Sequence, residues 1–250
     1  MSARDSMDGA RDASASVAPA RRDVGVVIVA GGSGIRADTG DGELKQFRWV
    51  AGKPMLLHSV QTFMARPDVV SVVCVLPRRY AGDPPPWLFQ CDLDRLAMSV
   101  GGKTRGESVA NGLDDLPDEA EIVLVHDAAR PLVGVDTLDR VVQSVRGGTS
   151  AIAALPVVDT LKEVDADGMI VRTVEREGLW RAQTPQGFPR RVIVDVHRRA
   201  RADRLSATDD AALCEHYGIA VRIVRGSERA LKVTEPADFA RIDALLAIDE

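Results

Sequence analysis

The 250-residue sequence has few cysteines, no paired cysteine motif and no long apolar run. An odd number of three widely spaced cysteines, Cys74, Cys91 and Cys214, indicates neither a disulfide framework nor a zinc site. No segment approaches the ~18 apolar residues that a membrane-spanning helix needs. These absences favour a protein of the reducing cytoplasm that does not enter a membrane.

An excess of basic residues is also absent. The chain has 32 Lys plus Arg against 37 Asp plus Glu, a net charge of -5. A nucleic-acid groove needs a basic surface, so no nucleic-acid partner is expected. Any polyanion must instead meet a local cluster of basic side chains. The four histidines lack the H-E-x-x-H spacing of a zinc site and are expected to be structural.

The first 23 residues are rich in Ser, Ala, Arg and Asp and have no apolar region of the kind found in secretory signals. Their acidic residues also argue against a transit peptide. Because so little apolar area could offset the ordering entropy, we expect a disordered tail over residues 1–23 and a single domain over residues 24–250.

Short apolar strands alternate with amphipathic helices through that domain. Strands are expected at Val26–Ala30, Val69–Pro77, Glu121–His126, Ser150–Val158 and Val221–Val224. Helices are expected at Met55–Ala65, Ser108–Leu116, Val135–Val145, Pro189–Arg201, Thr208–Tyr217 and Pro236–Ala247, with Thr208 as the cap of the fifth. This alternation predicts a doubly wound α/β fold with a mostly parallel sheet, whose ligands bind beyond the carboxyl ends of the strands.

Two segments interrupt the alternation. Arg78–Asp92 contains three consecutive prolines and is expected to be a surface loop. Val158–Val174 has strand-like halves around a glycine and predicts a protruding hairpin, part of an arm over residues of about 157–180. Because an isolated hairpin exposes two edges that a second copy could cover, the arm is a candidate for dimerisation.

A glycine-rich turn follows the first strand, where residues 29–36 read VAGGSGIR. It fails as a dinucleotide fingerprint because the third glycine is missing, and as a Walker loop because no Gly-Lys-Ser/Thr follows. A turn of glycines lets backbone N–H groups approach phosphates closely. With Arg36 and Lys45, it is either a polyphosphate clamp or a tight turn beside two solvated basic residues.

Three further segments favour the clamp. Gly101–Ser108 (GGKTRGES) is a second glycine turn after an expected strand. The segment HDAARP places Asp127 and Arg130 at the end of the third strand, where they could face the cleft or cap a helix. Lys232 lies between a strand and a helix and could reach the same cleft.

Taken in order, the segments resemble the 2-C-methyl-D-erythritol 4-phosphate cytidylyltransferases of non-mevalonate isoprenoid biosynthesis. The resemblance runs from about Val24 to the C-terminus. It is carried by AGGSGIR, KQF, GGKTRGESV, VLVHDAARP, PVVDTLK, TVEREGLWRAQTPQGF, TDDAAL and LKVTEPAD. It implies a Rossmann-like nucleotidyltransferase fold and an enzyme that transfers CMP from CTP to methylerythritol phosphate and releases pyrophosphate.

The resemblance also implies roles for individual residues. Arg36 and Lys45 correspond to residues that hold the triphosphate and stabilise charge on the reacting phosphorus, and Lys232 to a further phosphate contact. These three are expected to be catalytic. Nucleotide binding is expected at Ala30, Gly31, Gly32, Gly34, Gly102 and Ser108. Acceptor binding is expected at Asp127, Arg130, Thr160, Arg176 and Lys232. Thr160 and Arg176 match residues that enter the neighbouring subunit's site, so the resemblance implies a homodimer.

Such a reaction needs no protein nucleophile. A phosphate monoester, with a second pKa near ~6, is largely dianionic at neutral pH and can attack the α-phosphorus directly. Catalysis then consists of positioning and charge stabilisation, which suits cleft cations without a nucleophile constellation. Mg²⁺ is expected to bridge the phosphates and keep most of its waters, with Asp127 as the one candidate protein ligand.

The sequence departs from the family pattern around the first glycine turn. Residues 30–32 read Ala-Gly-Gly where the family usually has Ala-Ala-Gly, Leu44 stands where a proline usually precedes the lysine, and residues 38–43 are longer and more acidic than usual. Ala-Gly-Gly is common in related ribitol 5-phosphate cytidylyltransferases, so ribitol 5-phosphate or another polyol or sugar phosphate is an alternative acceptor. AARP, DTLK and LWRAQTPQGF favour methylerythritol phosphate. The alternative of another class is a silent, nucleotide-binding regulatory paralogue, which the three predicted catalytic residues argue against.

Overall fold

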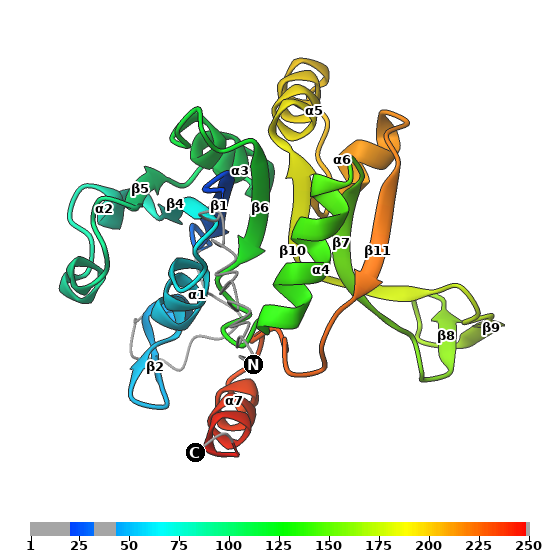
Figure 1. The fold of residues 1–250 in the computed structure, drawn as a ribbon. Coiled ribbons are helices and arrows are strands. Elements are labelled where there is room, and N and C mark those ends of the chain that lie inside the picture. Colours follow the sequence, from blue (N-terminus) through cyan, green and yellow to red (C-terminus); the bar gives the residue numbers. More distant parts are fainter. Residues whose placement is uncertain (1–20, 33–43, 249–250) are drawn as a thin grey trace, which may run out of the picture.

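The computed structural model describes residues 21–32 and 44–248. Its centre is a seven-stranded sheet of β1 (Val24–Val29), β4 (Val69–Leu76), β5 (Leu96–Val100), β6 (Ile122–Asp127), β7 (Ser150–Pro156), β10 (Trp180–Pro189) and β11 (Val221–Arg225). The strand order is β11-β7-β10-β6-β1-β4-β5 (Figure 1). Only β10 runs antiparallel to its neighbours. The predicted doubly wound, mostly parallel fold is confirmed.

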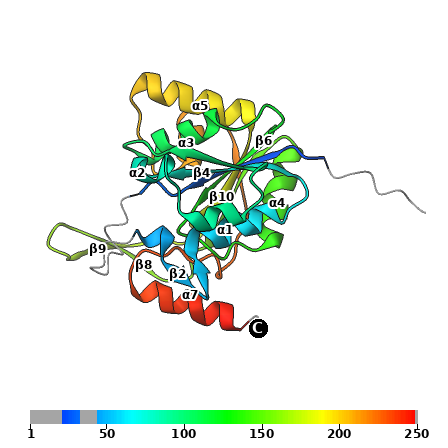
Figure 2. The ribbon, with the colours of Figure 1, turned by 90° about the vertical axis from the view of Figure 1, so that its left-hand side faces the viewer.

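Helices cover both faces of this sheet (Figure 2). On one face lie α1 (Met55–Met64) and α4 (Val135–Arg146), whose apolar sides join the larger core cluster. On the other lie α3 (Arg105–Asp114), α5 (Arg190–Asp203) and α6 (Asp210–His216), which share the second cluster. The strands between them are apolar on both sides because both sides are covered.

The last helix, α7 (Ala237–Ala247), packs away from the sheet against a small hairpin of β2 (Trp49–Val50) and β3 (Lys53–Pro54). A separate apolar cluster of Val50, Met55, Val233 and Ile242 holds this part together. The hairpin directly follows the 3-10 helix η2 (Lys45–Phe47). The C-terminal segment therefore supports the element that carries Lys45.

A crevice is expected between β1 and β6. The chain leaves β1 to form β4 and β5 on one side and later returns to form β6 on the other. At such a switch point the connections after the two strands diverge, and ligands bind beyond their carboxyl ends. Ala30, Gly31 and Gly32 follow β1 here, and Asp127 ends β6.

The predicted hairpin is confirmed as an antiparallel pair, β8 (Leu161–Val164) and β9 (Ile170–Val174), that forms a sheet of its own. Gly168 supplies the left-handed backbone of its turn, with φ of 80°. The hairpin projects from the body of the molecule (Figure 1).

Two predictions about individual elements were wrong, and one strand was missed. Arg78–Asp92 contains two short helices, α2 (Arg78–Ala81) and η3 (Pro86–Gln90); Pro86 begins η3, where a missing N–H is tolerated. The cap of α6 is Asp209, not Thr208, because the Asp209 carboxylate accepts a hydrogen bond from the Ala212 amide. Strand β10 was missed since its two prolines and a glycine discourage a strand, and its register shifts between Ala182 and Gln186.

The expected disordered tail lies almost entirely outside the described residues. None of the helices in the described ranges is long and apolar enough to cross a membrane.

Candidate active site

The two glycine turns lie against each other at the crevice. A Cβ atom at Gly31 would lie 3.2 Å from the Gly101 Cα, and one at Gly102 would lie 2.3 Å from the Glu107 Cβ. A side chain at either position would require its neighbours to move. The glycines thus allow the end of β1 and the loop before α3 to meet.

Ser108 closes the second turn from within α3. Its Oγ accepts a hydrogen bond from the Gly102 amide at 3.0 Å and donates to the Thr104 carbonyl at 2.9 Å. Thr104 is the cap of the helix and accepts from the Glu107 amide. Gly102 and Ser108 therefore shape this turn, and their contact with a nucleotide stays a prediction.

The helix η2 holds three side chains with three different environments. Lys45 Nζ donates to the Val233 carbonyl at 3.0 Å, and Gln46 Nε2 donates to the Ala30 carbonyl at 2.6 Å. Phe47 is buried against two aromatic rings. A 3-10 helix has three residues per turn, so consecutive side chains point in directions about 120° apart.

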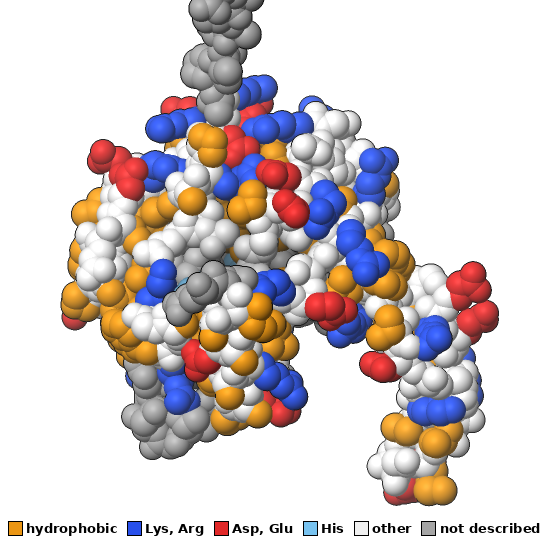
Figure 3. Space-filling view, turned by 60° about the horizontal axis from the view of Figure 1, so that its bottom comes forward, with side chains coloured by type: hydrophobic (Ala, Val, Ile, Leu, Met, Phe, Trp, Pro, Cys, Tyr) orange, Lys and Arg blue, Asp and Glu red, His pale blue; other side chains and the backbone are white. Residues whose placement is uncertain are grey.

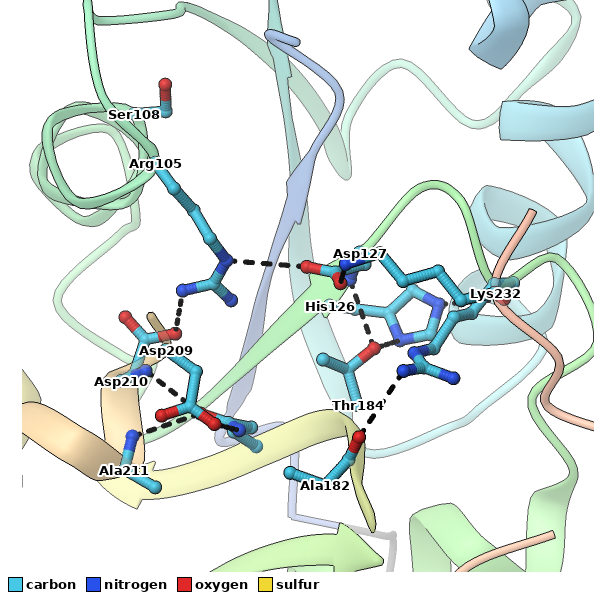
Figure 4. A network of polar contacts seen from close by, with 12 residues as sticks. Arg105, Ser108, His126, Asp127, Ala182, Thr184, Asp209, Asp210, Ala211 and Lys232 are labelled. Carbon is cyan, nitrogen blue, oxygen red and sulfur yellow. Dashed lines mark hydrogen bonds and ion pairs between the residues drawn. The ribbon is translucent and has the colours of Figure 1, made fainter. Parts of the chain in front are cut away.

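Asp127 is the centre of a network of charges (Figure 4). Its Oδ2 lies 2.7 Å from Lys232 Nζ, and its Oδ1 lies 3.4 Å from Arg105 Nε. Arg105 also pairs with the buried Asp210, at 2.7 Å, and Asp210 in turn contacts His197 Nε2 at 2.9 Å. Acidic and basic side chains alternate in this network, so each buried charge has a partner.

The cations determine the ionisation of Asp127. Burial by itself opposes ionisation, but the charges of Arg105 and Lys232 outweigh it and hold the pKa of Asp127 well below its usual range. Asp210 behaves in the same way: burial opposes ionisation, and Arg105 and His197 lower its pKa. Asp127 is therefore a carboxylate at neutral pH and keeps the Lys232 ammonium at the crevice.

The backbone beside the pair brings the C-terminal segment to the end of β6. Arg130 Nη1 donates to the Ala230 carbonyl at 2.7 Å, and the Val233 amide donates to the Ala129 carbonyl at 2.8 Å. Lys232 lies between these two contacts. Arg130 is itself largely buried, and burial lowers its pKa. Its position on the Ala230 carbonyl contradicts the alternative of a helix cap.

Thr184 and His126 hold the backbone of Asp127 in place through hydrogen bonds. Thr184 Oγ1 accepts from the Asp127 amide at 3.1 Å and lies 2.9 Å from His126 Nδ1. His126 Nε2 lies 3.0 Å from the Arg130 carbonyl, which can only accept, so Nε2 carries the proton and Nδ1 accepts from Thr184. Burial lowers the pKa of His126 to about 4, so the ring is neutral at neutral pH.

This histidine should make the protein sensitive to acid. Its pKa is lower in the folded state than the 6.5 of an unperturbed ring, so the unfolded state binds a proton first. Its contribution is present above pH 6.5 and is lost as the pH falls through 4, about 3 kcal/mol in all. Denaturant unfolding between pH 7 and 4 should give a shallower pH slope for His126→Gln than for the wild type. Equal slopes would contradict the assignment.

The two predicted arm residues lie apart from this network. Thr160 directly precedes β8, and Arg176 follows β9 and donates to the Val158 carbonyl. Within the described part of the chain neither has a hydrogen bond or ion pair with Asp127, Arg130 or Lys232. No contact among the described residues supports a role for Thr160 or Arg176 in the crevice of their own subunit.

The structure thus brings together most of the predicted residues. Lys45, Asp127, Arg130 and Lys232 lie close together near the carboxyl ends of β1 and β6, with the two glycine turns, whereas Gly34 and Arg36 lie outside the described residues. Basic side chains border the hollow seen from this side (Figure 3). The histidines were predicted to be structural. That prediction did not anticipate that His126 supports Asp127 through Thr184.

Several supporting residues were not predicted from the sequence. Arg105 lies within GGKTRGES, Gln46 within KQF and Thr184 within AQTPQGF, so the segments were noticed but these side chains were not. The one available signal was their position in those segments. Their partners lie between 14 and 105 residues away in the chain, which no local pattern indicates.

The residues present fit a protein-bound metal poorly. Both oxygens of Asp127 already face cations, Oδ1 that of Arg105 and Oδ2 that of Lys232. Among residues 21–32 and 44–248, no group of three or more His, Cys, Asp or Glu side chains could hold a metal ion. A divalent cation would have to be held mainly by the phosphates of a ligand.

The doubly wound sheet, the glycine turns at its switch point and the basic crevice define an enzyme of the nucleotidyltransferase class. The chain belongs to the IspD family, whose model, 2-C-methyl-D-erythritol 4-phosphate cytidylyltransferase, matches residues 24–248.

Individual relatives agree with this assignment. A 2-C-methyl-D-erythritol 4-phosphate cytidylyltransferase of Streptomyces coelicolor is 45% identical over 239 residues, which cover 92% of this chain and 86% of the relative. That of Salinibacter ruber is 42% identical over 221 residues, covering 88% and 91%. The crystal structure of the Thermus thermophilus enzyme matches with a TM-score of 0.74 and 32% identity, covering 90% of this chain and 99% of that one.

Proposed function

We propose that this protein transfers CMP from CTP to 2-C-methyl-D-erythritol 4-phosphate, forming 4-diphosphocytidyl-2-C-methyl-D-erythritol and pyrophosphate. The observation that carries the proposal is the Asp127–Lys232 pair at the end of β6. Lys45 lies next to it and donates a hydrogen bond to the carbonyl of Val233, the residue after Lys232. Two ammonium groups beside a glycine turn match a reaction that must bring two polyanions together. The names of the relatives supply the acceptor.

Each cation has a part in this proposal. Lys45, with Arg36, holds the triphosphate and stabilises negative charge as the acceptor phosphate attacks the α-phosphorus in line. Lys232, held by Asp127, contacts the reacting phosphates, and Arg130 lies beside the acceptor. Asp127 acts by orienting Lys232 and by accepting hydrogen bonds from the polyol. The acceptor is already a dianion, so no side chain has to remove its proton.

A divalent cation, Mg²⁺, is part of the proposal as a companion of the nucleotide. When bound, it neutralises phosphate charge. Asp127 is left out of its ligands because the positive charges of Arg105 and Lys232, which already contact its two oxygens, oppose the binding of a further cation.

The test is pyrophosphate release by purified protein with CTP and Mg²⁺, with methylerythritol 4-phosphate and ribitol 5-phosphate supplied in parallel. Release with the first acceptor alone is the expected result. Release with ribitol 5-phosphate alone would move the protein to polyol metabolism, the alternative that Ala30-Gly31-Gly32 favours. CTP binding without turnover of either acceptor would favour the silent paralogue.

We also propose that the arm forms a homodimer. The arm, residues of about 157–180, leaves many apolar side chains exposed: Val158, Leu161, Val164, Met169, Ile170, Val171, Leu179 and Trp180. Ile170 and Val171 are 64% and 59% exposed although they are adjacent in β9, so both faces of the hairpin are apolar. A second copy would cover this surface and both strand edges.

The dimer would bring Thr160 and Arg176 into the partner's crevice, where they would hold the acceptor phosphate. Arg176→Ala should then raise KM for the acceptor and leave KM for CTP nearly unchanged. A mixed dimer of Arg176→Ala and Lys45→Ala chains should recover one working site in two, because one crevice receives both intact residues. An inactive mixed dimer of confirmed composition would place Arg176 in its own subunit's crevice.

We place the reaction in the cytoplasm. The three cysteines are free thiols, two of them buried, which agrees with a compartment in which disulfides do not form. Fractionation of cells that express a tagged chain would test this placement.

A further inference from the structure

Gln46 has an unusual environment for a residue outside the predicted site. Its side chain is buried, 3% exposed, and its single amide nitrogen faces two backbone carbonyls of the first glycine turn. Nε2 lies 2.6 Å from the Ala30 oxygen and 3.1 Å from the Gly32 oxygen. Two carbonyl oxygens on one nitrogen require both of its N–H groups as donors, so the orientation of the amide is fixed by chemistry.

These bonds determine which way the turn presents its backbone. Glycine has little preference between positive and negative φ, so peptide groups in a glycine-rich turn can rotate at low cost. A carbonyl rotated toward the crevice would place a partial negative charge against a triphosphate. The hydrogen bonds from Gln46 hold the Ala30 and Gly32 carbonyls toward Gln46, so these carbonyls do not rotate toward the crevice.

The donor itself is firmly placed. Gln46 lies in η2 between Lys45 and Phe47, and the Phe47 ring packs edge-on against Tyr80 and Trp87 at 4.8 and 5.8 Å between centroids. Phe47 is 5% exposed, so this packing anchors the helix to the body of the protein. The turn is tied to a fixed element instead of depending on its own conformational preference.

We propose that Gln46 is the positioning residue of the nucleotide-binding turn: it orients the Ala30–Gly32 backbone for the phosphates of the nucleoside triphosphate. The inference rests on the proposed function, since that function assigns the turn to the nucleotide. It also gives the KQF segment one common purpose. Lys45 supplies charge, Gln46 sets the turn that faces the same ligand, and Phe47 fixes both.

The test is Gln46→Met, which keeps the length of the side chain and removes both donors. We expect Kd and KM for CTP to rise about tenfold, as the loss of about two hydrogen bonds implies, with KM for the acceptor unchanged. A purely structural role would reduce the amount of active enzyme, and so kcat, and leave KM for CTP as it is. That outcome would overturn the inference.

Two controls separate the amide's role from general effects of substitution. Gln61→Met makes the same chemical change on the exposed side of α1, where Gln61 accepts from Lys53 Nζ at 2.8 Å. Val142→Ala removes apolar volume from the core beneath α4 and matches a loss of stability. Neither should change KM for CTP, and a tenfold rise in either would overturn the inference.

Hydrogen exchange distinguishes failure of this inference from failure of the proposed function. In the ligand-free protein, the amide of Ala30, which donates to the Val75 carbonyl at 2.9 Å, should exchange about tenfold faster in Gln46→Met, with the amides of β4 unchanged. If the wild type turns over neither acceptor, the proposed function fails while this result still supports Gln46 as the residue that orders the turn. Unchanged exchange in the turn would overturn the inference whatever the activity.

Discussion

Replacing Lys45 with methionine should lower kcat about 10²–10³-fold and leave KM for the acceptor nearly unchanged. The Lys45 ammonium group donates to the carbonyl of Val233, the residue after Lys232, and comes from an element held in place by Gln46 and Phe47. A cation that acts mainly on charge developing in the transition state affects kcat more than binding. Steady-state kinetics with each substrate varied in turn would measure this separation.

The matched control for this prediction is Lys53→Met. Lys53 lies in β3, close in the chain, and its ammonium contacts the Gln61 side chain at an exposed position. Its loss should change kcat less than about twofold, because a solvated cation contributes little. A rise in KM for CTP at constant kcat in Lys45→Met would show that Lys45 binds the ground state and does not stabilise the transition state.

Replacing Asp127 with asparagine should affect both stability and turnover. The change leaves Arg105 and Lys232 facing a neutral group, and the loss of one partner from a buried ion pair costs about 3 kcal/mol. Turnover should fall because Lys232 is no longer held at the crevice. Denaturant unfolding and steady-state kinetics on the same preparation would measure the two effects separately.

A double-mutant cycle tests whether Asp127 acts through Lys232. In the Lys232→Met background, Asp127→Asn should lower kcat/KM much less than in the wild type, because the partner is already gone. Additive losses would show independent roles. Asp139→Asn is the matched control: Asp139 pairs with Arg66 at 2.6 Å but its side chain is 47% exposed, so its loss should cost less than about 1 kcal/mol.

Much of the fold could be read from local sequence. Continuous apolar runs predicted the ends of β1, β4, β6 and β7 to within two residues, because a strand covered on both faces needs apolar side chains throughout. Helical spacing located α1, α4, α5 and α7 equally well. Strand β10 escaped because its sequence, WRAQTPQGFP, discourages a strand locally, and only pairing with β6 and β7 on both sides makes it one.

By itself, the sequence determined the alternation of strands and helices, the two glycine turns and the basic residues expected to face a polyphosphate. These depend on periodicity, backbone freedom and charge, which are properties of short segments. Tertiary structure alone decided which charges meet. Arg105 pairs with Asp127 and with Asp210, 105 residues further on, and Gln46 donates to the turn after β1. Such partners are selected by how β1, β6, α3 and α6 pack together, because a buried charge or amide is stable only where the fold supplies its complement.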